Sequence, residues 1–310
     1  MWYKFVSGGG GQGLRQLSLW ICGIGFLYGI ARVFGTGEII SSLQSIPKAM
    51  IVLLLCLQLL TLAMSSFLWY YLLRKAGADL GFLRMFSLYL AGCFVESVTP
   101  SVKFGGEAAK LYLVRRETGL SYEEITGVLL ANKIVTLLPF LLMSAVVFIC
   151  STSNLFAASI NSLYYWSAGI VCATILVFIL RAKKGFFYQA MQNCRQLLRG
   201  SMIVMLLVST GVWLLYPCKV YLIAQSLGHF IGYTNVAAAT FTAYVVGLLP
   251  LLPGGLGSFE VTMATVLTHY ALPMSHAVAV TLGARSITFW FTLVFSSFFA
   301  LRFVPWKVSI

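Results

Sequence analysis

Long uninterrupted apolar runs are the feature that most constrains this chain. A helix needs about 20 mainly apolar residues to cross the hydrocarbon core of a bilayer. Six segments meet this requirement: Leu17–Gly35, Ala49–Leu73, Tyr122–Cys150, Leu163–Leu180, Ser201–Leu227 and Pro273–Leu301. Only 9% of the 310 residues are charged, which is too few to cover a soluble protein. The sequence therefore predicts an all-α polytopic membrane protein and excludes soluble enzymes and secreted disulfide scaffolds.

Two further apolar stretches, Gly81–Arg116 and Gly232–Tyr270, are interrupted by proline and glycine. The first breaks at Thr99-Pro100 and carries Gly105-Gly106, and the second breaks at Pro253-Gly254-Gly255. Each half is about 10–20 residues long, which is short for a full span but suits a half-helix. We therefore expect six spanning helices plus two re-entrant helical hairpins.

The distribution of basic residues supports this arrangement. The chain has 21 Lys+Arg against 8 Asp+Glu, a net charge of +13, and basic residues gather on the cytoplasmic side of membrane proteins. With six crossings, both termini are cytoplasmic and only Lys48 and the edge residue Arg32 face outward. The inner face then holds Lys4, Arg15, Arg74, Lys75, Arg84, Arg115, Arg116, Arg181, Lys183, Lys184, Arg195, Arg199, Arg302 and Lys307. The excess charge thus indicates orientation and contact with anionic lipid, and no nucleic acid partner is expected.

The two halves of the chain form an inverted repeat within a single domain, residues 1–310. Repeat one covers about residues 49–150, and repeat two about 201–302. In the first, Glu107 follows Gly105-Gly106 and precedes Lys133 by 26 residues; in the second, Glu260 follows Pro253-Gly254-Gly255 and precedes Arg285 by 25. Interrupted helices at corresponding positions of inverted repeats are typical of transporter substrate sites. Between the repeats, residues 183–200 are predicted to form a basic interfacial helix, with Phe186, Phe187, Leu197 and Leu198 on its apolar side and Lys183, Lys184, Arg195 and Arg199 facing lipid headgroups.

The charges expected near the bilayer midplane are the candidate site. Lys133 and Arg285 lie about 16–18 Å along their spans, where an unpaired charge costs roughly 2.5–3.5 kcal/mol. One interpretation is two ion pairs, Glu107–Lys133 and Glu260–Arg285, that pin each hairpin to its span. The other is a polar cavity that receives a charged headgroup, and the two are compatible.

The helix ends that follow each glycine pair add to this site, because a helix N-terminus attracts phosphate. The candidate binding residues are Glu107, Lys133, Glu260, Arg285, Lys103, Lys110, Gly105, Gly106, Gly254, Gly255 and Gly257, with hairpin breaks at Pro100 and Pro253. Lys103 and Lys110 are alternatively snorkelling charges of the inner face. Secondary candidates are Glu96, Tyr112, Asn132 and Lys219. No metal-ligand spacing and no catalytic motif is present, so no cofactor and no enzymatic activity are expected.

Two segments of the sequence resemble the signatures of a known family. They are Thr99-Pro100 with Gly105-Gly106-Glu107-Ala-Ala-Lys110-Leu-Tyr112, and Leu249-Pro250-Leu-Leu-Pro253-Gly254-Gly255-Leu256-Gly257-Ser-Phe-Glu260 with Arg285. These segments look like those of the lysylphosphatidylglycerol synthase transmembrane-region family, over roughly Ala49 to Leu301. The family includes the flippase domain of the bacterial multiple peptide resistance factor and standalone relatives. That factor carries a soluble aminoacyl-transferase domain after its membrane part; because this sequence ends at Ile310, we do not expect it to be the synthase.

The resemblance implies a flippase-like protein of the cytoplasmic (inner) cell membrane. It would move an anionic or aminoacylated phospholipid, or another polar lipid, between leaflets. Two other functions stay open: an ion-coupled transporter of a small anion, and a membrane subunit of a lipid-modifying enzyme. The expected partner is a membrane lipid with an anionic headgroup; a homodimer and a separate lipid-synthesising enzyme are left open as further partners.

Overall fold

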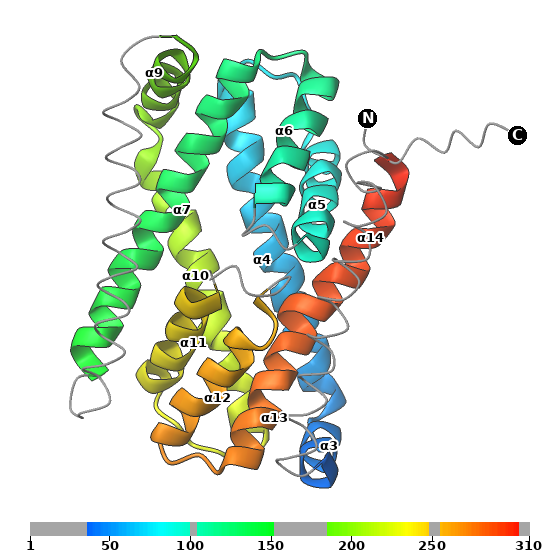
Figure 1. Ribbon diagram of the computed structural model, residues 1–310, viewed down its shortest axis with the longest axis vertical. Helices are drawn as coiled ribbons and strands as arrows, with labels where there is room; N and C mark the ends of the chain where they lie inside the picture. Colours follow the sequence, from blue (N-terminus) through cyan, green and yellow to red (C-terminus); the bar gives the residue numbers. More distant parts are fainter. Residues whose placement is uncertain (1–35, 100–103, 152–184, 248–254, 304–310) are drawn as a thin grey trace, which may run out of the picture.

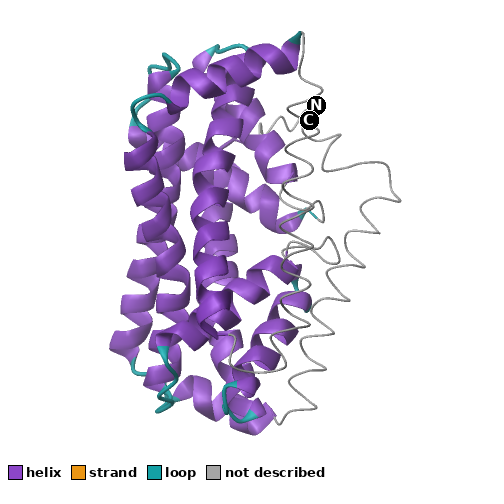
Figure 2. Cartoon of the chain, turned by 90° about the vertical axis from the view of Figure 1, so that its left-hand side faces the viewer, coloured by secondary structure: helices purple, strands orange, loops and turns teal. Residues whose placement is uncertain are grey.

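A computed structural model describes residues 36–99, 104–151, 185–247 and 255–303. These residues form helices and connecting loops, and no strand occurs among them (Figures 1 and 2). The helices are α3 Thr36–Gln44, α4 Lys48–Lys75, α5 Phe82–Val98, α6 Phe104–Thr118, α7 Tyr122–Ser151, α9 Phe186–Leu198, α10 Met202–Ser226, α11 Tyr233–Gly247, α12 Ser258–His269, α13 Met274–Arg285, the π-helix η2 Ser286–Phe291, and α14 Thr292–Phe303.

Within the described residues, four helical segments are long and apolar enough to cross a membrane: Lys48–Lys75, Tyr122–Val147, Met202–Ser226 and Met274–Phe303. The last is one continuous run of α13, η2 and α14. Large apolar side chains point outward from these segments; Ile203 is 76% exposed and Leu207 68%. Such surfaces suit lipid rather than water, so the chain is a multi-pass membrane protein. The predicted spans at residues 17–35 and 163–180 lie outside the described residues.

Two pairs of short helices lie between the long ones. The pair α5 and α6 has 17 and 15 residues, and the pair α11 and α12 has 15 and 12. At ~1.5 Å per residue they reach about 18–26 Å, less than the ~30 Å hydrocarbon core. Both helices of the first pair have their outer ends at the end of the molecule where α4 finishes and α7 begins (Figure 1). The outer ends of the second pair lie at the opposite end of the molecule, so the inner ends of the two pairs face each other at mid-height.

Each pair has its own apolar core. Around α5 and α6, the core includes Leu72, Met85 and Ile125, and around α11 and α12 it includes Ile223, Met263 and Val280. The helices of each pair are therefore held by the long helices beside them, which fixes the position of their inner ends.

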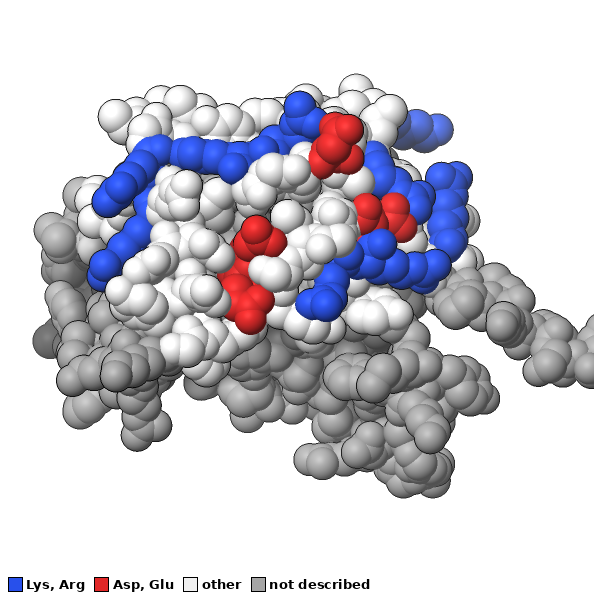
Figure 3. Space-filling view, turned by 90° about the horizontal axis from the view of Figure 1, so that it is seen from above, with Lys and Arg blue, Asp and Glu red and all other residues white. Residues whose placement is uncertain are grey.

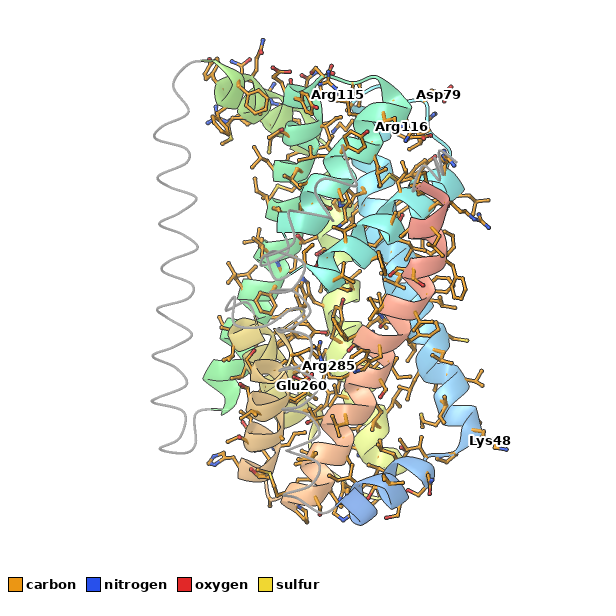
Figure 4. The ribbon with its side chains drawn as sticks, turned by 45° about the vertical axis from the view of Figure 1, so that its right-hand side comes forward. Lys48, Asp79, Arg115, Arg116, Glu260 and Arg285 are labelled. Atoms are coloured by element: carbon orange, nitrogen blue, oxygen red, sulfur yellow. The ribbon has the colours of Figure 1, made fainter. Side chains whose placement is uncertain are left out.

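One end of the molecule is strongly basic (Figure 3). Arg115 and Arg116 lie at this end and Lys48 at the other (Figure 4). The further described cations at the basic end are Arg74, Lys75, Arg84, Arg195, Arg199 and Arg302, at the ends of α4, α9 and α14 and the start of α5. The described charges thus divide between the two ends as the sequence predicts.

The helix predicted within residues 183–200 is present as α9 and lies across the basic end (Figures 1 and 2). Its buried residues are Ala190, Cys194 and Leu197, which belong to one face and pack toward α7. Phe186 and Phe187, in the first turn of α9, are 39% and 49% exposed. Lys75 at the end of α4 fixes the other end of α9: its Nζ donates to the carbonyl oxygen of Leu197 at 2.7 Å.

Candidate functional site

Close contact between α5 and α6 depends on two glycines. A Cβ on Gly106 would lie 2.5 Å from Glu96 Cβ and 2.9 Å from the carbonyl oxygen of Gly92. A Cβ on Gly92 would lie 2.3 Å from Cγ of Lys110. No larger side chain fits at these contacts without displacing a helix. The two glycines therefore bring Glu96 of α5 beside the first turn of α6. Gly106 was a predicted site residue, whereas Gly92 was not.

Four charged side chains meet at the inner end of this first helix pair. Glu107 Oε1 accepts hydrogen bonds from Lys133 Nζ at 2.7 Å and from Lys110 Nζ at 3.3 Å. Glu96 Oε2 lies 3.8 Å from Lys110 Nζ. The predicted Glu107–Lys133 ion pair is therefore present, and it is part of a larger cluster with two cations and two carboxylates. We call Glu96, Glu107, Lys110 and Lys133 the first charge cluster.

Lys110 is deeply enclosed in this cluster. Its side chain is 3% exposed, and its Nζ lies 4.7 Å from the ring centroid of Tyr89 and 5.8 Å from that of Trp69. An ammonium over aromatic rings is stabilised by their negative faces. Lys110 therefore does not snorkel to the inner face. The role of Tyr89 and Trp69 was missed from the sequence, since aromatic residues beside apolar runs are ordinary core or interface residues.

Two acceptor atoms beside Lys133 are buried and have no hydrogen-bond partner among the residues that the structure describes. They are Glu107 Oε2 and Asn132 Oδ1. Buried polar atoms are normally satisfied by protein or water. The first charge cluster can therefore accept additional hydrogen-bond donors.

The inner end of the second helix pair holds the second predicted ion pair. Arg285 Nε donates to Glu260 Oε1 at 2.7 Å, and both residues lie at the inner end of α12 beside α13 (Figure 4). The guanidinium also lies between two rings, 4.6 Å from the centroid of Phe259 and 4.5 Å from that of Phe289. The pair is enclosed, since the side chains of Arg285 and Glu260 are 7% and 4% exposed.

Glycines shape the turn that precedes α12. Gly255 and Gly257 have φ of 69° and 83°, a region that side chains with a Cβ rarely adopt. A Cβ on Gly255 would lie 3.0 Å from the carbonyl oxygen of Gly247, so the turn also packs tightly on α11. The Gly257 N–H donates to Glu260 Oε2 at 2.7 Å. Glu260 therefore fills the N-terminus of α12, which was expected to be available to a phosphate.

A π-helix begins directly after Arg285, at Ser286, and runs to Phe291. Such segments insert an extra residue into a helix and are frequent at functional sites. Here it places Phe289 against the guanidinium. A run of apolar and hydroxyl residues gives no sequence signal for a π-helix, so this feature was not predicted.

The two charged sites differ in exposure. Lys133 is 36% exposed, whereas Arg285 is 7% exposed. Glu96 is also accessible, at 27%. The repeat seen in the sequence is therefore asymmetric in space: Lys133 and Glu96 of the first charge cluster are accessible, whereas both members of the Glu260–Arg285 pair are enclosed.

Some predicted site residues lie elsewhere. Tyr112 is 41% exposed on α6 and is not in the first charge cluster. Lys219 belongs to a separate network with Gln58 and Thr61 of α4. Gly105 is buried beside Gly106 in the first turn of α6. Pro100, Lys103, Pro253 and Gly254 lie outside the described residues.

The outer end of the first pair is closed by an ion pair. Arg84 donates two hydrogen bonds of 2.9 Å to Glu117, joining the start of α5 to the end of α6. These bonds, together with the positive charge of Arg84, lower the pKa of Glu117 from its ordinary value. The pair makes the two short helices one unit.

These features define the chain as a multi-pass helical membrane protein with two opposed pairs of short helices and charged groups at their inner ends. Residues 16–296 match the family described as "Lysylphosphatidylglycerol synthase TM region". The chain therefore belongs to this family, as its two motifs indicated.

Relatives of known sequence agree with this assignment. A UPF0104 membrane protein of Methanothermobacter thermautotrophicus is 24% identical over 87% of this chain and 90% of its own length. Similar proteins of Methanocaldococcus jannaschii and Pyrococcus horikoshii are 21% and 22% identical over 85% and 81% of this chain, and over 88% and 85% of their own lengths.

Proposed function

We propose that this protein is a flippase-like transporter that moves a lipid with an anionic headgroup between the leaflets of the cytoplasmic membrane. Anionic or aminoacylated phospholipids and other polar lipids belong to this substrate class. The family assignment and the inverted arrangement of the two helix pairs support this function. In this role the chain transports lipid without catalysing a reaction, and a separate enzyme synthesises the lipid.

The proposed topology has six spans, two re-entrant hairpins and both termini in the cytoplasm. The first hairpin is α5 with α6, and it enters from the basic end; the second is α11 with α12, and it enters from the opposite end. Both helices of each pair are too short to cross the bilayer, and their outer ends lie at the same end of the molecule (Figure 1). The basic end is cytoplasmic by the positive-inside rule.

Lys133 is the residue that we propose binds the lipid headgroup, and one observation carries this assignment. Lys133 is 36% exposed, although it lies 11 residues into α7, about 16 Å along the helix. Its partner Glu107 is also bound by the enclosed Lys110. Lys133 can therefore turn toward a phosphate while Lys110 keeps Glu107 paired. An exchange of one charge partner for another avoids the large cost of an isolated charge in the membrane.

The Glu260–Arg285 pair has a different proposed role. Because it is enclosed by two rings and bonded to the backbone of the preceding turn, it fixes the second hairpin to the α13–α14 helix. The headgroup then moves past a rigid second hairpin after leaving the first charge cluster. This division of roles follows the difference in exposure between the two sites.

Leaflet exchange of labelled lipid in vesicles tests the function. The full chain is reconstituted with fluorescent phosphatidylglycerol, and a membrane-impermeant quencher reports how much label reaches the other leaflet. Vesicles with the protein should exchange label faster than empty vesicles. Lys133→Met should slow this exchange, whereas Lys48→Met, the same change at an end of α4, should leave it unchanged. Equal rates with and without protein contradict the lipid transport, and equal rates for the two variants contradict the assignment of Lys133.

A further inference from the structure

Lys219 of α10 is a buried cation outside both charged sites. Lys219 is 0% exposed, and it lies two residues after Pro217, within the span Met202–Ser226. Among the ion pairs of the described residues, none links Lys219 to a carboxylate. A buried lysine held by neutral groups alone is unusual, because buried charges are normally paired.

The groups around Lys219 suit both the charged and the neutral form of its amine. Its Nζ donates to Gln58 Oε1 and, at 3.1 Å, to Thr61 Oγ1, and it lies 4.6 Å from the ring centroid of Tyr216. The ammonium has three donors, and the oxygen of Gln58, the oxygen of Thr61 and the ring of Tyr216 can take one each. After loss of a proton, the Gln58 amide can turn over, so that its NH₂ group donates to the free lone pair of the amine.

The same glutamine links Lys219 to the helix that carries Arg285. Gln58 Nε2 donates to Thr292 Oγ1 at 2.8 Å, and Thr292 is the first residue after the π-helix. When the amide turns over, its oxygen faces Thr292 in place of its NH₂ group. The Thr292 hydroxyl then donates the hydrogen bond that it accepted before. The protonation of Lys219 can therefore be transmitted from α4 to η2 and α14.

A row of aromatic rings makes a second connection. Tyr216, which contacts Lys219, lies 4.9 Å from Tyr244, and Tyr244 lies 5.1 Å from Phe259 between ring centroids. Phe259 in turn covers the guanidinium of Arg285. Closely packed rings transmit small displacements because protein interiors are dense.

We propose that Lys219 is a proton-binding site that couples proton movement to the lipid transport proposed above. In one step of the cycle, an N–H bond of the ammonium breaks and the proton passes to water that enters between α4 and α10. In the return step, the amine takes a proton from water on the opposite side of the membrane, so that one proton crosses in each cycle. The amide of Gln58 turns with each step and moves the α13–α14 helix, together with the second hairpin fixed to it, relative to α4.

The surroundings of Lys219 limit which groups compete for this proton. The titratable groups that face it are Tyr216 and Cys218, both on its own helix. α4 contributes Gln58 and Thr61 and α14 contributes Thr292, and none of these ionises.

A pH difference across the vesicle membrane tests the coupling. The full chain is reconstituted with fluorescent phosphatidylglycerol, and the final distribution of label between leaflets is measured with and without the difference. One proton moved per lipid shifts this distribution by up to about tenfold per pH unit. Lys219→Met and Lys219→Arg, which cannot exchange the proton, should lose the shift, and Lys48→Met should keep it. A wild-type protein that exchanges lipid without any shift overturns the inference and leaves the lipid transport intact.

Lysine NMR tests the proton site without any lipid assay. The full chain is labelled at lysine Cε and Nζ, and the Lys219 signal is identified by its absence from Lys219→Met. The signal should take both the ammonium and the amine positions within the pH range over which the protein stays folded. A signal that keeps one position over this range overturns the inference even if the vesicles exchange no lipid.

Discussion

Separating the two charges of the enclosed pair is the sharpest test of its structural role. Glu260→Gln takes the carboxylate away from Arg285, whose side chain is 7% exposed. Arginine cannot lose its charge in a protein, so the guanidinium stays charged in an enclosed site that has lost its carboxylate. Removing one partner of a buried pair costs about 3–5 kcal/mol, and we expect Glu260→Gln to reach this range.

The opposite variant should be milder. Arg285→Met leaves Glu260 with the Gly257 N–H at 2.7 Å, and the carboxylate can become neutral by binding a proton. A cost of about 1–3 kcal/mol is expected, as for a buried polar group that has lost one partner. The double variant contains no charge at this site, so it should cost no more than Arg285→Met alone. The coupling between the two positions should therefore be at least as large as the cost of Glu260→Gln alone, about 3–5 kcal/mol.

Unfolding in mixed micelles with increasing sodium dodecyl sulfate measures these free energies. Arg302→Met is the control, because Arg302 is an exposed cation at the end of the same helical run, and surface changes stay within about 0.5 kcal/mol. If the costs of the two single variants simply add in the double variant, the pair does not act as a unit and the reasoning is refuted.

Two further predictions concern the first helix pair. Gly106→Ala should destabilise the protein by about 1–3 kcal/mol, because its Cβ meets Glu96 Cβ at 2.5 Å, whereas Gly37→Ala has free space; equal melting temperatures for these variants contradict the close contact of α5 and α6. The pKa of Glu117 is lowered in the folded state by Arg84, so the pair stabilises the fold above the unfolded pKa, and this contribution disappears as pH falls through the folded pKa. Glu117→Gln should therefore melt below the wild type at neutral pH and approach it in acid; a difference that is independent of pH contradicts the pairing.

The long helices could be predicted closely because apolar length alone determines them. The segment predicted at Ala49–Leu73 is the helix Lys48–Lys75, and the one predicted at Ser201–Leu227 is Met202–Ser226. The charges buried between the helices could also be paired in advance, because an acid and a cation that both lie in an apolar environment stabilise each other. Both predicted pairs, at Glu107 and Glu260, are present.

The composition of each site depends on packing that the sequence does not display. Glu96 joins Lys110 only because Gly106 lets α5 and α6 approach, and the difference in exposure between Lys133 and Arg285 arises from the neighbouring helices. One missed feature had a signal: a glycine three residues before Glu260 matches the spacing of a capping box. That spacing indicates that the carboxylate itself fills the helix end.

Retention of lipid by Lys133 tests the central claim most directly. Native mass spectrometry of the protein released from its membrane measures how many phospholipid molecules stay bound and identifies their headgroups. If Lys133 passes from Glu107 to a lipid phosphate, the wild type and Lys48→Met should retain a lipid with an anionic headgroup, and Lys133→Met should lose it while its melting temperature stays close to that of the wild type. Equal retention by all three proteins would contradict the assignment of the first charge cluster as the headgroup site.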